Sequence, residues 1–377
     1  MPPPRAGLVQ ATNGNFYGTT VSSGTYGFGT VFEITTSGTL TTLHSFDGTD
    51  GIEPEAGLVQ ATNGNFYGTI YEGGAHSIGT VFKITPSGTL TSLHSFYDTD
   101  GVSTYATLVQ GTNGDLYGTT WEGGAHGDGT VFKITTSGML TTLHSFDGTD
   151  GEDPYAGLVQ GTDGDLYGTT QLGGAHGGGT VFKITLSGKL TTLHSFCSQS
   201  GCTDGFLTYA TLVQGTNGDL YGTTALGGAK NSKCLENECG TDFKSTPSGT
   251  QTTLRSFEYT DGATPEAALV QDTNGDFYGT TEFGGTHNAG TVFRLSLGLG
   301  PFVETQPTSG MVGAAVKILG TNLTGATKVT SNGTLATFTV VSSSEIMTTV
   351  PTGATTGKVK VTTPSGTLTS NVNFRVP

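Results

Sequence analysis

A stretch of about fifty residues recurs six times along this chain and constrains its fold more than any other feature. The copies begin with Leu-Val-Gln at Leu8, Leu58, Leu108, Leu158, Leu212 and Leu269, so the spacings are 50, 50, 50, 54 and 57 residues. Twelve consecutive letters are identical in residues 8–19 and 58–69. Repetition at this period is typical of arrays in which each copy buries its apolar face against the next copy.

Each copy contains four short segments with the alternation expected of β-strands, as with Phe82 and Ile84 on one face and Lys83 on the other. Asn-Gly or Asp-Gly separates the first two segments, which favours a tight hairpin with the positive φ angles of primed turns. Gly supplies 62 of the 377 residues and no tract of helix formers is present. The sequence therefore predicts an all-β, six-bladed β-propeller over residues 1–298, with an open β-solenoid as the alternative.

The fourth segment, Leu-His-Ser-Phe or Leu-Arg-Ser-Phe, ends at Phe46, Phe96, Phe146, Phe196 and Phe257 and has no sixth copy. The last blade is therefore expected to have three strands. Residues 1–7 contain three prolines, which makes them a poor source of a closing strand. We expect either a truncated N-terminus or a ring that closes on a blade with an exposed edge.

Residues 299–377 break the period and consist of short alternating segments with Gly and Asn turns, which predicts a small β-sandwich. This part resembles an IPT/TIG domain of immunoglobulin-like fold, through PTSGMVGAAVKILGTNL and GKVKVTTPSG. Residues 6–295 resemble the GloVer tandem repeat of bacterial "choice-of-anchor" surface proteins, through LVQ, NGDLYGTT, GTVFKIT and LHSF.

The GloVer resemblance implies an exported bacterial protein, extracellular or on the cell surface, and it brings no defined activity. The start MPPPRAGLVQ lacks the charged and apolar regions of an export signal, which again predicts a truncated or misassigned N-terminus. No apolar run is long enough to cross a bilayer, so membrane insertion is not expected.

Charge is distributed unevenly along the chain. Residues 1–299 hold 28 Asp and Glu against 10 Lys and Arg, whereas residues 300–377 hold 2 against 5. In the propeller topology 21 of the 28 acids are expected in or beside the longer loops, at one end of the blades. An acidic surface argues against nucleic acid as a partner and favours cations or cationic ligands.

Repeated Asp-x-Thr-Asp-Gly loops are the best candidates for a metal site. Calcium is one interpretation, with carboxylates from Asp47, Asp50, Asp98, Asp100, Asp147 and Asp150 as ligands. The other interpretation is turn chemistry, because Asp before Gly accepts backbone N–H bonds. Ligand spacing of an EF-hand is absent, and Ca²⁺ is the one cofactor that the sequence suggests.

Histidine and cysteine each invite a metal interpretation. His44, His94, His144 and His194 lie on outermost strands, too far apart to share an ion, and are expected to pack between blades. His76, His126, His176 and His287 follow the Gly-Gly loop and are expected to fix it. The four cysteines favour local disulfides, Cys197 to Cys202 and Cys234 to Cys239, over a four-thiolate zinc site.

Residues that differ among the copies are the better candidates for a ligand site, because residues present in every copy serve the scaffold. The candidates near the long loops are Tyr71, Tyr105, Trp121, Glu122, Tyr155, Tyr209 and Glu282. Exposed aromatic rings beside acids can stack on sugar rings, or they can cover the ends of the core.

No nucleophile elbow, phosphate-binding loop or HExxH motif is present, so no catalytic residue is assigned. We interpret the chain as a non-enzymatic extracellular binding or adhesion module, with a polysaccharide, a cation or a surface protein as partner. An extracellular carbohydrate-active hydrolase or lyase is the alternative, and a purely structural surface protein is a third interpretation. Oligomeric state does not follow from the sequence.

Overall fold

A computed structural model describes residues 6–229, Cys234 and residues 239–376, and in this part of the chain the regular elements are all β-strands. The chain forms two compact units. The first comprises the chain up to Gln214, Gly218–Leu269 and Gly279–Phe293, and the second comprises Gly215–Asn217, Val270–Tyr278 and the chain from Arg294 onward. No helix able to span a membrane occurs among these described residues.

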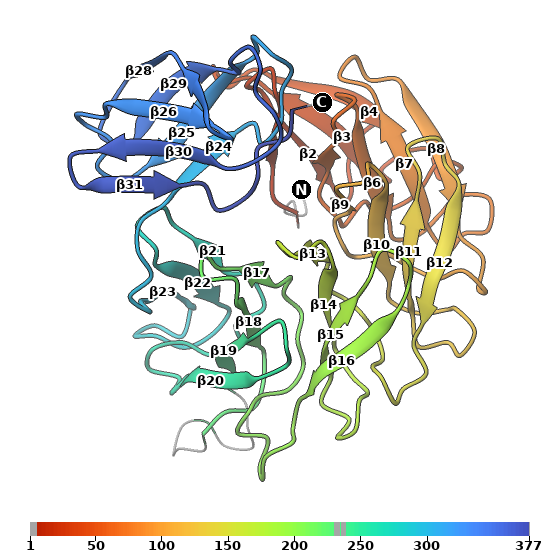
Figure 1. The fold of residues 1–377 in the computed structure, drawn as a ribbon. Helices are drawn as coiled ribbons and strands as arrows, with labels where there is room; N and C mark the ends of the chain where they lie inside the picture. The colour runs from red at the N-terminus through yellow and green to blue at the C-terminus, as the bar shows by residue number, and fades with distance from the viewer. Residues whose placement is uncertain (1–5, 230–233, 235–238, 377) are drawn as a thin grey trace. The chain divides into compact units, whose positions relative to one another are not determined.

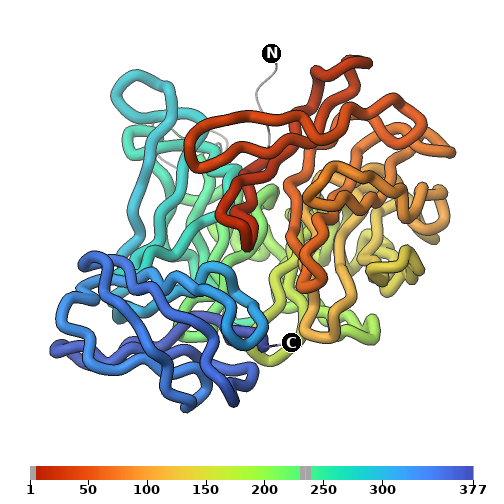
Figure 2. Tube along the Cα trace, turned by 90° about the horizontal axis from the view of Figure 1, so that it is seen from above, coloured from red at the N-terminus to blue at the C-terminus, as the bar shows by residue number. Residues whose placement is uncertain are grey.

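The repeats form propeller blades, as expected. Each of the first five copies is a four-stranded antiparallel sheet with its strands in chain order, and the sixth copy is a three-stranded sheet. The first five blades follow one another around a common axis, and their first strands, such as β9 (Val109–Gln110), β13 (Val159–Gln160) and β17 (Val213–Gln214), lie nearest to it (Figure 1). Figure 2 shows the same trace turned by 90°, with the hairpins of each blade running back and forth.

The strands of the six blades have nearly constant lengths. The innermost strands are β1 (Val9–Gln10), β5 (Val59–Gln60), β9 (Val109–Gln110), β13 (Val159–Gln160), β17 (Val213–Gln214) and β21 (Val270–Gln271). The second strands are β2 (Phe16–Thr20), β6 (Phe66–Ile70), β10 (Leu116–Thr120), β14 (Leu166–Thr170), β18 (Leu220–Thr224) and β22 (Phe277–Thr281). The third strands are β3 (Thr30–Ile34), β7 (Thr80–Ile84), β11 (Thr130–Ile134), β15 (Thr180–Ile184), β19 (Thr241–Ser245) and β23 (Thr291–Leu295). The outermost strands are β4 (Leu40–Ser45), β8 (Leu90–Ser95), β12 (Leu140–Ser145), β16 (Leu190–Ser195) and β20 (Gln251–Ser256).

The inner hairpin turns differ from the primed type that the Asn-Gly dipeptide suggested. In blade 1 the Gly14 N–H donates to the Ala11 carbonyl at 2.9 Å, and Gly14 has φ +86° while Asn13 does not have a positive φ. This is the pattern of a three-residue loop with one left-handed residue. Asn13 instead uses its side chain, which accepts the Asn15 N–H at 3.0 Å and donates to the Tyr17 hydroxyl at 2.9 Å.

The core of the propeller lies between neighbouring blades. Tyr17 of blade 1 stacks on Phe66 of blade 2 with ring centroids 4.1 Å apart, and Phe46 meets Phe82 edge-on at 5.5 Å. The glycine in each second strand makes room for the phenylalanine of the third strand: a Cβ on Gly118 would lie 2.7 Å from the Phe132 ring. The repeat therefore encodes the contact between blades as well as the hairpins within them.

The second unit contains an immunoglobulin-like sandwich of two four-stranded sheets. One sheet has the order β24-β25-β29-β28 and the other the order β27-β26-β30-β31. The strands are β24 (Val303–Gln306), β25 (Ala315–Gly320), β26 (Lys328–Ser331), β27 (Thr334–Ala336), β28 (Phe338–Val340), β29 (Glu345–Thr349), β30 (Val359–Thr363) and β31 (Gly366–Thr369). Val316, Ile318, Ile346 and Val361 are among the buried side chains between the sheets.

Candidate functional site

The longer loops of neighbouring blades are joined into one layer at one end of the propeller. In each blade from the second to the sixth, the loop that enters the blade pairs with the loop between its second and third strands. The bridges are Ile52 to Glu72, Val102 to Glu122, Glu152 to Leu172, Phe206 to Leu226 and Ala263 to Phe283. Variable side chains on these loops are thus held on a regular frame.

In each loop that enters a blade, one residue with a left-handed backbone conformation forms backbone hydrogen bonds to two blades. Ser103, with φ +52°, donates its N–H to the Ile78 carbonyl of blade 2 and accepts the Trp121 N–H of blade 3, both within 3.0 Å. Glu53, Asp153, Leu207 and Thr264 have the same conformation at the same repeat position. Non-glycine residues rarely adopt it. Five-fold repetition shows that the conformation belongs to the scaffold.

The repeat position three residues before the leucine of each Leu-Val-Gln motif lies next to the innermost strands. Blades 2 to 6 place Glu55, Tyr105, Tyr155, Tyr209 and Glu266 there. Three consecutive tyrosines are therefore bounded by a glutamate on each side. We call these five residues, together with Tyr71 and Trp121, the axial arc.

The rings of the axial arc form a continuous chain of contacts. Tyr105 is central: its ring lies 4.7 Å from that of Tyr71, 4.4 Å from that of Tyr155 in a stacked arrangement and 5.7 Å from that of Trp121. Tyr155 continues the chain to Tyr209 at 5.5 Å, edge to face. All five rings are half-buried, so each keeps part of its surface open.

Two carboxyl groups beside the axial arc have a raised pKa. Burial, together with the charges of Glu152, Glu122 and Asp128, raises the pKa of Asp153 to about 6. Burial and the neighbouring Glu282 also raise the pKa of Glu266. Because like charges near these groups disfavour ionisation, a bound cation or a hydrogen-bond donor would be stabilised there.

Two further polar groups belong to this end of the propeller. Burial and then Glu266 raise the pKa of the Tyr209 hydroxyl, and the nearby Gln171 side chain opposes this rise. The nearby Trp121 side chain lowers the pKa of Asp153, against the larger effect of burial. Its indole N–H makes no hydrogen bond to any acceptor among the described residues. Burial raises the pKa of Tyr105, and the neighbouring Tyr71 hydroxyl adds to that rise.

The structure brings together the five aromatic residues that the sequence singled out. Glu122 and Glu282 are exposed beside them and act on Asp153 and Glu266 through their charges. Glu55, Asp153 and Glu266 were missed. Aligning the copies would have identified Glu55 and Glu266, because they occupy the repeat position of the three tyrosines.

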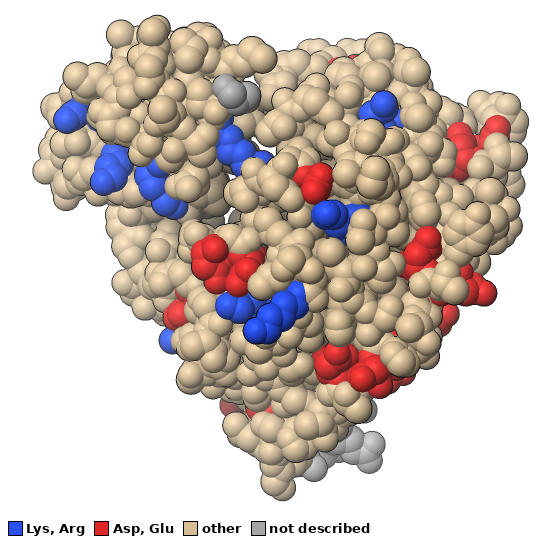
Figure 3. Space-filling model, turned by 45° about the vertical axis from the view of Figure 1, so that its right-hand side comes forward, with Lys and Arg blue, Asp and Glu red and all other residues tan. Residues whose placement is uncertain are grey.

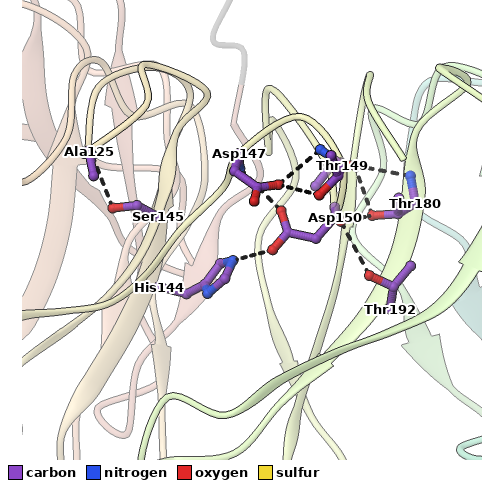
Figure 4. Close-up of polar contacts among 9 residues, drawn as sticks. Ala125, His144, Ser145, Asp147, Thr149, Asp150, Thr180 and Thr192 are labelled. Atoms are coloured by element: carbon purple, nitrogen blue, oxygen red, sulfur yellow. Dashed lines mark hydrogen bonds and ion pairs between the residues drawn. The ribbon is translucent and has the colours of Figure 1, made fainter. Parts of the chain in front are cut away.

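The Asp-x-Thr-Asp-Gly loops have internal partners for their carboxylates. In blade 3 the Asp150 carboxylate lies 2.7 Å from His144 Nε2 and accepts the Asp147 N–H at 3.2 Å (Figure 4). Asp147 accepts both the N–H and the hydroxyl of Thr149, and these bonds lower the pKa of Asp147. Asp47 and Asp50 repeat this arrangement with His44, whereas Asp100 pairs with His94 and the Asp98 position is exposed.

The hydrogen bonds of these aspartates to their own loop and to the neighbouring histidine are sufficient to fix the loop conformation without a metal ion. Among the residues that the structure describes, no three His, Cys, Asp or Glu side chains converge as a metal site would require. Calcium binding at Asp47, Asp50, Asp98, Asp100, Asp147 and Asp150 stays one of the two interpretations of these loops, with turn chemistry as the other, and a test is given below.

The histidines on the outermost strands have two partners each. Rings of His44, His94, His144 and His194 meet the phenylalanine two residues later edge-on, and their Nε2 atoms contact the loop aspartate. In the second set, the ring of His76 lies 3.9 Å from that of Tyr97, and both residues are exposed.

The cysteines pair locally in the structure. Cys197 bonds to Cys202 and Cys234 bonds to Cys239. Residues 230–233 and 235–238 of that insertion lie outside the described residues. Each bridge closes a short loop at the long-loop end of blade 4 or blade 5.

Charge differs between the two ends of the blades. At the tight-turn end, strand lysines pair with turn acids, as with Lys183 and Asp165 at 3.1 Å and Lys244 and Asp219 at 3.3 Å. In Figure 3 basic residues near the centre lie against acidic ones, while acidic side chains without a basic neighbour border the right-hand side. For one of the 21 acids that we expected near the loops the prediction is wrong, because Asp242 is fully buried in β19.

Fold and loops together define a β-propeller that is followed by an immunoglobulin-like domain. The chain belongs to the Gloeobacter/Verrucomicrobia repeat family, which matches residues 2–162 and 137–303, and residues 302–376 match the IPT/TIG domain. Both resemblances drawn from the sequence are confirmed. Among curated proteins, none matches the chain.

Three solved structures are similar to this chain over most of its length. Hydrazine synthase of Kuenenia stuttgartiensis is 12% identical with a TM-score of 0.50, covering 85% of this chain and 77% of that one. Virginiamycin B lyase from Staphylococcus aureus is 14% identical with a TM-score of 0.49, covering 90% and 92%. A fungal alcohol oxidase is 12% identical with a TM-score of 0.41, covering 98% and 96%. At such identities the likeness concerns the fold alone.

Proposed function

We propose that this protein is an extracellular, non-enzymatic binding module whose axial arc takes a carbohydrate ligand. The observation that carries the proposal is the unbroken chain of rings from Tyr71 through Tyr105 and Tyr155 to Tyr209, half-buried and bordered by carboxylates. Flat aromatic surfaces stack on the apolar faces of sugar rings, and nearby carboxylates accept sugar hydroxyl bonds.

Two further observations support this function. The arc uses repeat positions that vary among blades, and variable residues on a rigid scaffold are the usual place for binding. The propeller is acidic, with 28 acids against 10 basic residues in residues 1–299, so nucleic acid is excluded from the proposed partners. The local disulfides and the GloVer resemblance support an exported location.

Titration calorimetry with neutral and amine-bearing oligosaccharides tests the proposal. We expect saturable binding by at least one class, and loss of most of the affinity in Tyr105→Ala and Tyr155→Ala, because both variants break the ring chain at its centre. Tyr97→Ala is the matched control, since Tyr97 is an exposed tyrosine that is not part of the arc. Binding that survives both arc variants, or no binding by either class, would contradict the proposal.

The alternative function is a carbohydrate-active hydrolase or lyase at the same place. Asp153 favours it, because a carboxyl whose pKa is raised to about 6 can donate a proton near neutral pH. Incubation of each bound oligosaccharide with the protein, followed by analysis of products, separates the two functions. Cleavage that is lost in Asp153→Asn would establish the enzyme, and intact ligand would support the binding module.

A further inference from the structure

A lysine and an asparagine lie opposite each other at the end of the last hairpin of the immunoglobulin-like domain. In the antiparallel pair β30–β31 the ladder continues past the end of β31, where the Ser370 N–H donates to the Val359 carbonyl at 2.8 Å. The next position of this register places Lys358 opposite Asn371. Directly opposed residues of antiparallel strands share a face, with Cβ atoms roughly 5 Å apart, so these two side chains are neighbours.

The side-chain amide of Asn371 is surrounded by polar groups. The Lys358 side chain donates to the Asn371 backbone carbonyl at 2.6 Å, which brings Nζ to the residue that carries the amide. The amide nitrogen Nδ2 donates to Glu304 Oε1 of β24 at 3.2 Å, and the amide oxygen Oδ1 accepts the Val372 N–H at 2.9 Å. Glu304, Lys358 and Asn371 are all half-buried. An amine, a carboxyl group and a backbone N–H donor therefore meet around one amide.

Burial shifts both ionisable groups of this set toward their neutral forms. It raises the pKa of the Glu304 carboxyl, against the opposing hydrogen bond from Asn371, and the charge of Asp272 adds to the rise. Burial also lowers the pKa of the Lys358 amine. A neutral amine has the lone pair that a nucleophile requires, and a protonated carboxyl can give its proton to a leaving group.

We propose that Lys358 and Asn371 react with each other to form an isopeptide bond within the chain, with Glu304 as the group that transfers protons. The Lys358 Nζ atom attacks Asn371 Cγ, the electron pair of the C=O bond moves to Oδ1, and the Val372 N–H stabilises the charge there. The Cγ–Nδ2 bond then breaks and ammonia leaves. A primary amine and a primary amide become a secondary amide and ammonia, so the atoms balance without any further reactant.

Glu304 can serve both nitrogen atoms, because after the attack they are bonded to the same carbon. Its carboxyl gives a proton to Nδ2, with which it already shares a hydrogen bond, and takes one from Nζ. Groups held in contact within one fold react as if at a very high concentration, which allows an amide that is inert in water to react. The product closes the β30–β31 hairpin covalently.

The intact mass of the full chain, with its disulfides reduced, tests this proposal. We expect a mass below that of the sequence by one molecule of ammonia. Lys358→Arg and Glu304→Gln should keep the full mass of their sequences, because the first lacks the nucleophile and the second lacks the acid. Lys360→Arg is the matched control, since Lys360 is an exposed lysine of the same strand, and it should lose ammonia as the wild type does. Circular dichroism checks that each variant is folded.

Tryptic digestion of the wild type locates the bond and does not depend on the folding of any variant. Cleavage after Lys328, Lys360 and Arg375 gives residues 329–360 and 361–375, which should remain joined as one branched peptide that is uncut after Lys358. Loss of ammonia without this branched peptide would place the reaction elsewhere and overturn the proposal. A wild type of full mass, or loss of ammonia in Lys358→Arg or Glu304→Gln to the extent seen in the wild type, would also overturn it.

Discussion

Arg255 lies directly opposite Asp242 in neighbouring strands of blade 5, with Nη2 3.1 Å from a carboxylate that is fully buried. The guanidinium also covers the rings of Phe257 and Phe293, at 4.1 and 4.5 Å from their centroids. In blades 1 to 4 the same pair of positions holds valine and histidine, as with Val31 and His44. An ion pair has replaced an apolar contact at one interface of the propeller.

Removing one partner of this pair should lower the free energy of unfolding, whereas replacing both partners should not lower it. Arg255→Leu leaves the Asp242 carboxylate buried without a counter-charge, so we expect a loss of about 3 kcal/mol or more in the free energy of unfolding. The double variant Asp242→Val/Arg255→His restores the pair of the other blades and should be at least as stable as the wild type. Denaturant unfolding measures both. A double variant as unstable as Arg255→Leu would contradict this reasoning.

The same carboxyl predicts a pH dependence of stability. Burial raises the pKa of Asp242 to about 7, against the opposing effect of Arg255. The folded state therefore holds this proton more tightly than the unfolded state, in which the pKa is about 4. Its contribution to stability is complete below that value and is lost as pH rises toward about 7.

Unfolding curves of the wild type and of a second double variant, Asp242→Val/Arg255→Leu, recorded at several pH values, isolate this effect, because this double variant adds no group that titrates between about pH 4 and about pH 7. The wild type should lose stability relative to the double variant as pH rises from about 4 to about 7. Other acids with a raised pKa, such as Asp153, are common to both proteins and cancel in the difference. A difference that is constant with pH would show that Asp242 does not titrate in this range.

The loop aspartates should stabilise the fold through their hydrogen bonds. Asp150→Ala removes the contact with His144 Nε2 and the acceptor of the Asp147 N–H, so we expect a loss of about 1–3 kcal/mol. Asp98→Ala, in the exposed position of the equivalent loop in blade 2, should change stability by less than about 0.5 kcal/mol. Equal effects in the two variants would refute a role for the histidine contact.

Calcium is tested by thermal unfolding with EGTA and with added Ca²⁺ at matched ionic strength. Because Asp147 and Asp150 already accept bonds from their own loop, we expect the two midpoints to coincide. An ion that binds only the folded state would raise the midpoint. A clear rise with Ca²⁺ that disappears in Asp150→Ala would establish a calcium site at these loops.

Much of the fold could be predicted because the repeat carries both the hairpins and the contacts between blades. The three-stranded last blade followed from counting one segment. The turn type was wrong because Asn13 acts through its side chain, which the dipeptide alone does not reveal. The burial of Asp242 could have been inferred, since it occupies the strand position of Val181 in the preceding copy.

The axial arc was harder to predict. Tyr71, Tyr105, Trp121, Tyr155 and Tyr209 were candidates as separate variable residues, but their mutual contacts depend on how far each loop leans toward the axis. Asp153 could not be singled out, because its raised pKa comes from burial and from Glu152, Glu122 and Asp128 on neighbouring loops. Chemistry at this end of the propeller depends on tertiary placement, whereas the blades depend on local pattern.

The most direct test of the proposed function uses Trp121, the single tryptophan of the chain. Its ring contacts Tyr105 within the axial arc, so its fluorescence reports on that site. Titration with the oligosaccharides that bind in calorimetry should change its emission saturably, with the same Kd, and the change should weaken in Tyr155→Ala. Binding heat without any change in Trp121 emission would place the ligand elsewhere and contradict the account.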